Sequence, residues 1–92
     1  MRVLIVDDEK PARDRLRQIL SDEDGFDVVG EAGNGHDAVA RSAELCPDVV
    51  LLDIRMPGLD GIETAHHLNA LEQPPAVVFT TCLLYTSDAA DE

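Results

Sequence analysis

The chain has 92 residues, with 7 Lys and Arg against 19 Asp and Glu, a formal net charge of −12 and 45% hydrophobic residues. This length allows one domain at most, and the apolar share is too high for a disordered acidic tail. The negative charge argues against direct nucleic-acid binding, because phosphate backbones attract Lys and Arg. It suits a cytoplasmic protein that handles cations or docks on basic partners. No apolar run approaches the roughly 20 residues that cross a bilayer, so no membrane association is expected.

Short apolar runs without polar alternation predict strands that are covered on both faces, as in a parallel sheet. Three such runs are residues 3–6, 49–52 and 77–79, and the weaker run 27–31 suits an edge strand. Amphipathic periodicity in the intervals predicts three helices. Their expected apolar faces are Ala12, Leu16, Ile19 and Leu20 after Pro11; Ala38, Val39, Ala43 and Cys46 after residues 33–35; and Ile62, Ala65, Leu68 and Leu71 after Gly61. Strands that alternate with helices predict an α/β fold with right-handed crossovers.

Three acidic residues directly follow predicted buried strands. Asp7 and Asp8 come after residues 3–6, and Asp53 comes after residues 49–52. Ligands of open parallel sheets bind beyond the carboxyl ends of the strands, so we expect these three carboxylates to converge. Like charges at that spacing need protonation or a cation, and oxygen ligands without His or Cys favour Mg²⁺. The alternative is that they are separate solvated loop acids, with Asp7 or Asp8 favouring the N-terminus of the first helix.

The segment after Asp53 contains Pro57 and Gly58, which predict a turn rather than an immediate helix. Such a turn leaves Asp53 exposed and can direct a backbone carbonyl towards a metal. Asp60 is placed to cap the third helix. The fourth strand is expected to end in Thr80 and Thr81. A hydroxyl beside a carboxylate–metal site can hydrogen-bond a phosphoryl oxygen, although β-branched residues also belong in strands for their own sake.

Three segments together resemble the receiver domain of bacterial two-component response regulators. They are Val6-Asp7-Asp8-Glu9, Leu52-Asp53-Ile54-Arg55-Met56-Pro57-Gly58-Leu59-Asp60-Gly61 and Phe79-Thr80-Thr81, and the resemblance covers residues 1–81. It implies a flavodoxin-like, doubly wound parallel sheet, here incomplete, with its four strands in the order 2-1-3-4. The details look closest to regulators with a LytTR-type DNA-binding output domain.

The resemblance also implies a role for individual residues. Asp53 resembles the phosphoacceptor, and Thr81 matches the switch hydroxyl. Mg²⁺ would be bound by Asp8, Asp53 and the backbone carbonyl of Arg55, with Asp7 assisting partly through water. The implied partner is a sensor histidine kinase, and the implied role is a signalling phosphoacceptor rather than an enzyme. DNA binding would belong to an output domain outside these residues, and a homodimer of the intact protein is compatible with the family.

The chain departs from the family pattern after residue 81. Complete receivers have five strands and five helices, and the lysine that ends the fifth strand has no counterpart here. Residues 82–92 instead resemble translated read-through of a sequencing adapter. We therefore expect a partial receiver domain over residues 1–81, a non-native tail over 82–92, an exposed apolar edge at the fourth strand, and marginal folding or aggregation.

Two other functions remain as alternatives. The first is an inert truncated fragment with at most Mg²⁺ binding. The second is a haloacid-dehalogenase-like phosphatase, which needs a second Asp two residues after its nucleophile, whereas position 55 is Arg. Three histidines, at positions 36, 66 and 67, are interpreted as solvated helix residues. Arg13, Arg15 and Arg17 either bind an acidic partner or form an exposed face with local ion pairs.

Overall fold

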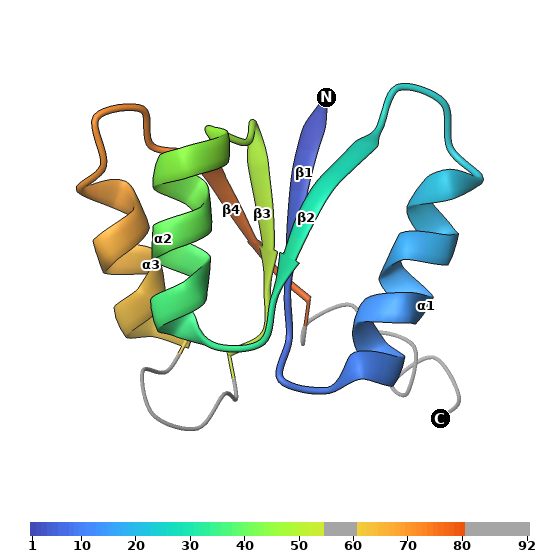
Figure 1. Cartoon of the computed structure of the whole chain (residues 1–92), viewed down its shortest axis with the longest axis horizontal. Coiled ribbons are helices and arrows are strands. Elements are labelled where there is room, and N and C mark those ends of the chain that lie inside the picture. The colour runs from blue at the N-terminus through green and yellow to red at the C-terminus, as the bar shows by residue number, and fades with distance from the viewer. Residues whose placement is uncertain (55–60, 81–92) are drawn as a thin grey trace, which may run out of the picture.

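The computed structural model describes residues 1–54 and 61–80, which form four strands and three helices (Figure 1). Their order is β1 (Arg2–Val6), α1 (Lys10–Ser21), β2 (Asp27–Ala32), α2 (Gly35–Leu45), β3 (Val49–Leu52), α3 (Gly61–Asn69) and β4 (Ala76–Phe79). All seven elements that the sequence predicts are confirmed, with small differences at their ends. The predictions for Arg55, Asp60, Thr81 and residues 82–92 lie outside the described residues.

The four strands are all parallel and lie in the order β2-β1-β3-β4. This confirms the α/β, flavodoxin-like arrangement and its 2-1-3-4 strand order. Val6 pairs with Ala32 on one side and with Leu52 on the other, so β1, β2 and β3 end at the same level. The residues that follow β1 and β3 therefore emerge side by side at one edge of the sheet.

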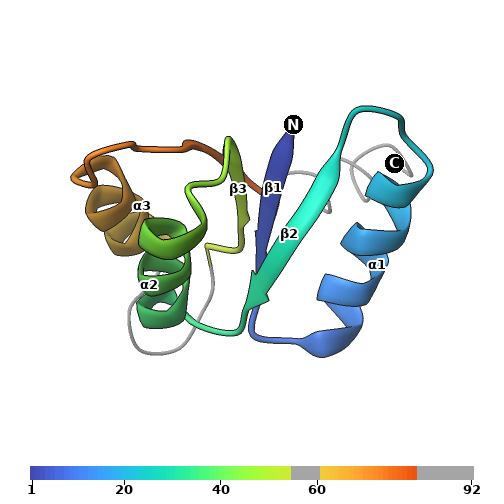
Figure 2. The ribbon, with the colours of Figure 1, turned by 45° about the horizontal axis from the view of Figure 1, so that its top comes forward.

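Alternate residues of β1 and β3 serve two separate hydrophobic cores, one on each face of the sheet. Helices α2 and α3 cover one face and α1 covers the other, as Figures 1 and 2 both show. The core under α2 and α3 contains Leu4, Val6, Ala32, Ala38, Val50, Leu52 and Leu68. The core under α1 contains Val3, Ile5 and Val49, with Leu16, Leu20, Val28 and Leu51 packed against them. Burial on both faces explains why these strands read as continuous apolar runs.

The apolar face predicted for each helix includes at least one residue that is exposed in the structure. Leu16 and Leu20 pack under α1, but Ile19 is 54% exposed, because only one line of a helix can meet the flat face of a sheet. On α2, Ser42 is buried while Ala43 is exposed, and Cys46 is an exposed residue at the C-terminal cap with a left-handed φ of 48°. The helix thus faces the sheet slightly off the stripe that hydrophobicity alone predicts.

Strand β4 is an edge of the described sheet and is only partly covered. Val77 and Phe79 pack towards the core under α2 and α3, whereas Val78 on the other face is 42% exposed. Ile62 of α3 is 50% exposed, in disagreement with its predicted place in the core. It lines an open groove between α3 and β4, of about 510 Å³, rather than the sheet surface. Among residues 1–54 and 61–80, β4 is thus the last strand on its side of the sheet and carries an exposed apolar side chain, Val78.

Within residues 1–54 and 61–80, no helix combines the length and the apolar character that a membrane span requires.

Candidate metal centre

Backbone hydrogen bonds between neighbouring strands fix the starting points of the acidic residues. The Asp7 N–H donates to the Ala32 carbonyl at 3.1 Å, which continues the pairing of β1 with β2. The Asp53 N–H donates to the Val6 carbonyl, also at 3.1 Å, which continues the pairing of β3 with β1. Asp7 and Asp53 are consequently held on adjacent strand ends before their side chains make any contact.

The carboxylates of Asp7, Asp8 and Asp53 converge in one acidic pocket. One carboxylate oxygen from each residue lies within 4.8 Å of the others. Asp7 is buried at 5% exposure, Asp53 is half-buried and Asp8 is exposed, so the pocket opens to solvent on the Asp8 side. The predicted convergence is confirmed, and the alternative of three separate loop acids is wrong as a description of the geometry.

The environment of Asp7 disfavours its charge. Burial raises the pKa of the Asp7 carboxyl, and the neighbouring carboxylates of Asp53 and Asp8 raise it further. A hydrogen bond from the Glu9 N–H to Asp7 Oδ1, at 2.9 Å, acts in the opposite direction. Glu9 is the N-cap residue of α1, so Asp7 also supports the start of that helix, as the alternative interpretation expected. The repulsion between these neighbouring carboxylates adds to the effect of burial on Asp7.

The donor set of the pocket fits a hard divalent cation. Among the described residues, the cluster offers three carboxylates and no imidazole or thiolate. Oxygen-only donors suit Mg²⁺ and Ca²⁺ rather than zinc, and an opening towards solvent leaves room for the waters that Mg²⁺ retains. A divalent cation would also offset the repulsion that raises the pKa of Asp7.

The N-terminus of α3 packs directly against the backbone that carries Asp53. The Gly61 N–H donates to the Ile54 carbonyl at 3.0 Å. A Cβ atom at Gly61 would lie 2.5 Å from the Ile54 Cα and 2.8 Å from the Asp53 carbonyl oxygen. Only glycine permits this approach, so the position of Asp53 depends on the absence of a side chain at residue 61.

A second cluster joins the pocket to the neighbouring edge of the sheet. Arg13 donates from Nη1 to the Asp7 carbonyl at 2.7 Å and from Nε to Glu31 Oε1 at 3.0 Å. Arg17 donates to Glu31 Oε2 at 2.7 Å. Burial alone would raise the pKa of Glu31, but the bonds from Arg17 and Arg13 outweigh it and hold that pKa below its ordinary value. Arg15 and Arg17 are exposed, as the interpretation of an ordinary exposed face expects, although Arg17 pairs with Glu31 of β2 rather than within its own helix. Arg13 departs from that interpretation, because its side chain is only 19% exposed.

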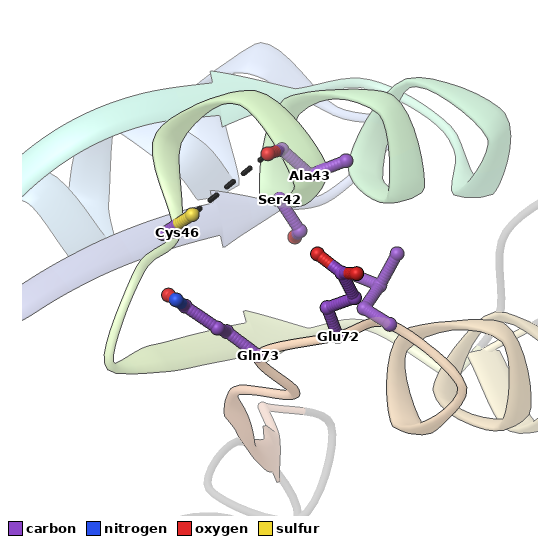
Figure 3. Close-up of a pocket in the computed structure, with 6 residues that line it drawn as sticks. Ser42, Ala43, Cys46, Glu72 and Gln73 are labelled. Carbon is purple, nitrogen blue, oxygen red and sulfur yellow. Dashed lines mark hydrogen bonds between the residues drawn. The ribbon is translucent and has the colours of Figure 1, made fainter.

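A separate hollow of about 240 Å³ lies at the opposite end of the sheet, beside the C-terminus of α2 (Figure 3). It is lined by Ser42, Ala43, Cys46, Leu71, Glu72 and Gln73. The buried Ser42 hydroxyl has no hydrogen-bond partner among the described residues. The three aspartates take no part in this hollow, so it is distinct from the acidic pocket.

The sequence of the chain was compared with profiles of known families. The sequence profile described as the response regulator receiver domain matches residues 3–91. The chain belongs to the response regulator receiver domain family. The resemblance that the motifs around Asp7, Asp8 and Asp53 suggested is thereby confirmed.

Individual relatives of this receiver domain are longer proteins. The positive alginate biosynthesis regulatory protein of Pseudomonas aeruginosa is 52% identical over 82 residues, which cover 88% of this chain and 33% of that protein. A protein-glutamate methylesterase/protein-glutamine glutaminase of Myxococcus xanthus is 50% identical over 78 residues, which cover 85% of this chain and 22% of that protein. The chain thus spans about a third or less of these curated relatives.

Solved structures agree with the fold. The response regulator domain of Thermotoga maritima CheB is 39% identical with a TM-score of 0.81, over 86% of this chain and 58% of that chain. A CheX–CheY–BeF3–Mg²⁺ complex from Borrelia burgdorferi contains a chain that is 33% identical with a TM-score of 0.79, over 86% of this chain and 60% of that chain. Four parallel strands and three helices are therefore shared with known receiver domains.

The receiver domain brings together three of the five predicted site residues. Asp7, Asp8 and Asp53 form the pocket, whereas Arg55 and Thr81 lie outside the described residues. The predicted histidines at positions 36, 66 and 67 are exposed on their helices. The contact from Arg13 to the Asp7 carbonyl was not predicted from the sequence. A bond to a main-chain atom does not depend on the type of the accepting residue, so no residue pattern indicates it.

Proposed function

We propose that this receiver domain accepts a phosphoryl group on Asp53, with Mg²⁺ held by Asp8, Asp53 and the Arg55 carbonyl and with Asp7 assisting partly through water. The observation that carries the proposal is the convergence of three carboxylates within 4.8 Å at the ends of β1 and β3. Half-burial of Asp53 leaves its carboxylate accessible to a donor. Thr81 is the proposed switch hydroxyl.

In the proposed reaction, a carboxylate oxygen of Asp53 attacks the phosphorus of a phosphohistidine. The new O–P bond forms as the N–P bond breaks, and the leaving electron pair returns to the imidazole nitrogen of the donor. The product is an acyl phosphate on Asp53. Mg²⁺ supplies charge neutralisation between the carboxylates and the phosphoryl oxygens in such sites.

The chain's own residues set the geometry of this step. The bond from the Asp53 N–H to the Val6 carbonyl and the contact with Gly61 fix the backbone of the nucleophile. Asp7 and Asp8 present their carboxylates from the adjacent strand end. Carboxylate is a weak nucleophile, so positioning and charge compensation must provide most of the rate.

Phosphorylation by a small-molecule donor tests the proposal. The 92-residue chain is incubated with acetyl phosphate and Mg²⁺, and intact-mass spectrometry reports the added phosphoryl group. We expect one phosphoryl group on the parent chain, none on Asp53→Asn, and none on the parent when EDTA removes the metal. Absence of both phosphorylation and Mg²⁺ binding in the folded parent would instead support the inert fragment. The phosphatase alternative predicts release of inorganic phosphate from many substrates, and no residue of the described pocket favours it.

The biological setting is proposed from the family. A sensor histidine kinase would be the phosphodonor in the cytoplasm, and the longer relatives support an output domain beyond these residues, with a LytTR-type DNA-binding domain as the proposed type. A homodimer of the intact regulator is part of the same proposal. Phosphotransfer from a panel of purified histidine kinases, compared by initial rate, would identify the donor.

We also propose that the receiver portion is residues 1–81 and that residues 82–92 are a non-native tail. The alignments with the Pseudomonas aeruginosa and Yersinia pestis relatives extend over 82 and 81 residues, although the family profile extends to residue 91. Resequencing of the source locus tests this division. An uninterrupted reading frame through the codons of residues 82–92 would show that the tail is genuine.

A further inference from the structure

We propose that Arg13 is a positioning residue for the acidic pocket. Its guanidinium, anchored by Glu31, holds the backbone carbonyl of Asp7 and thereby fixes the loop that presents Asp7 and Asp8. This inference rests on the proposed function of the pocket, because it assigns Arg13 a role in the binding of Mg²⁺ there. Arg13 itself contributes no ligand atom to the pocket.

The first step in the argument is the way in which the Asp7 main chain is held on both sides. Its N–H donates to the Ala32 carbonyl of β2 at 3.1 Å. Its carbonyl accepts from Arg13 Nη1 at 2.7 Å, one of the shorter hydrogen bonds in the described residues. The peptide between Asp7 and Asp8 carries that carbonyl, so its orientation sets the direction from which the Asp8 side chain leaves the backbone. Without Arg13, the described structure shows no other side chain bonded to this carbonyl.

The second step is that Arg13 is itself well fixed. Its side chain is only 19% exposed, and its Nε donates at 3.0 Å to Oε1 of Glu31, the penultimate residue of the edge strand β2. Its own N–H donates to the Glu9 carbonyl, and the Glu9 N–H in turn bonds the Asp7 carboxylate at 2.9 Å. Arg13 therefore closes a ring of contacts around the loop between β1 and α1. A charge-assisted donor in such a ring stabilises one conformation of the loop.

The third step separates this geometric role from a general effect of charge. Arg17 donates to the same Glu31 carboxylate at 2.7 Å, whereas the side-chain bond to the Asp7 carbonyl in the described part of the chain comes from Arg13. Arg13→Gln and Arg17→Gln therefore remove the same charge and the same type of ion pair. Only Arg13→Gln also removes the bond to the Asp7 carbonyl. Arg17→Gln is consequently the control for the loss of one positive charge and of an ion pair with Glu31.

The experiment compares the 92-residue parent with Arg13→Gln, Arg13→Lys and Arg17→Gln. Calorimetry measures the Kd for Mg²⁺, and urea unfolding confirms that each variant is folded under the conditions used. We expect Arg13→Gln to weaken Mg²⁺ binding about tenfold or more, the usual effect of removing a group that orients a ligand. Arg17→Gln should stay within about twofold of the parent by the same reasoning. Arg13→Lys should fall between them, because one ammonium can serve only one of the two acceptors.

A spectroscopic readout tests the positioning without Mg²⁺. In ¹H–¹⁵N spectra of the metal-free chain, Arg13→Gln should shift the amide signals of Asp8 and Glu9, and Arg17→Gln should leave them in place. If the parent fails to bind Mg²⁺, the proposed function fails, and these amide shifts still decide the role of Arg13. If Arg13→Gln does not fold, Arg13→Lys carries the same comparison. Equal loss of Mg²⁺ affinity in Arg13→Gln and Arg17→Gln, or unshifted amides in the Arg13 variants, would overturn the inference.

Discussion

Replacement of Asp7 by Asn should make the metal-free protein more stable and weaken Mg²⁺ binding by about 10- to 100-fold. Asp7 is 5% exposed, and its carboxylate lies within 4.8 Å of those of Asp8 and Asp53. Two unit charges at about 5 Å repel by about 3 kcal/mol at an effective dielectric constant of about 20. Asn keeps an oxygen that can accept the Glu9 N–H, so this bond need not be lost.

Solvent at the exposed Asp8 reduces the repulsion, so the expected gain in unfolding free energy at neutral pH is about 1–2 kcal/mol. The sign of the pH dependence follows from the raised pKa of Asp7. A carboxyl whose pKa is higher in the folded state favours folding when protonated, so the parent loses stability as pH rises from the ordinary Asp pKa to the raised one. The advantage of Asp7→Asn should therefore be near zero at low pH and should grow as pH rises through that interval.

Urea unfolding followed by circular dichroism, at several pH values and with and without Mg²⁺, measures both effects. Asp24→Asn is the matched control, since it removes one negative charge from an exposed turn after α1. We expect saturating Mg²⁺ to stabilise the parent and Asp24→Asn but to have little effect on Asp7→Asn. If metal-free Asp7→Asn is less stable than the parent at neutral pH, repulsion among the three carboxylates does not destabilise the metal-free fold, and the reasoning is refuted. A stability gain that does not vary with pH would refute it as well.

Three further outcomes are expected. Gly61→Ala should destabilise the fold by about 1–3 kcal/mol and slow phosphorylation by acetyl phosphate, because a methyl group would meet the Ile54 backbone at 2.5 Å. Gly33→Ala is the control, because the nearest neighbour of its methyl group would lie at 3.7 Å. Equal stability of the two variants would contradict the packing argument. Glu31→Gln should cost roughly 1 kcal/mol or less at neutral pH, as expected for a partly exposed ion pair. Since the pKa of Glu31 is lowered, this cost should disappear as pH falls through its folded-state pKa, and a constant difference in urea midpoints would argue against the pair. Val78→Lys should reduce self-association of the chain in light scattering, because Val78 is 42% exposed on β4, the last strand on its side of the described sheet. Unchanged scattering would mean that this strand does not drive association.

The sequence was informative wherever burial left a continuous pattern. Runs such as residues 49–52 had to be strands covered on both faces, and β3 has those bounds in the structure. The convergence of Asp7 and Asp53 followed from parallel topology together with the family resemblance, because the order of strands cannot be obtained from local propensity. The position of the acidic pocket, at the ends of β1 and β3, could therefore be predicted.

Features that depend on the exact rotation of a helix, or on a bond to the main chain, could not be predicted in this way. Hydrophobicity placed Ala43 rather than Ser42 inside, since a small polar residue carries little signal for burial. Ile19 looked like a core residue, yet the line of contact under α1 passes through Leu16 and Leu20. The contact of Arg13 with a carbonyl escapes any pairing rule, because every residue of the chain has a carbonyl.

The pairing of β1 with β3 has a consequence for the order in which the chain acquires its native contacts. The two strands are separated by a whole strand and two helices, so their association closes a long loop and contributes strongly to the contact order of the domain. Asp7 and Asp8 belong to a local loop that can form early, whereas Asp53 joins them only when β3 has docked. A ligand that needs all three carboxylates therefore recognises only chains that have completed this step, and its binding stabilises them by mass action.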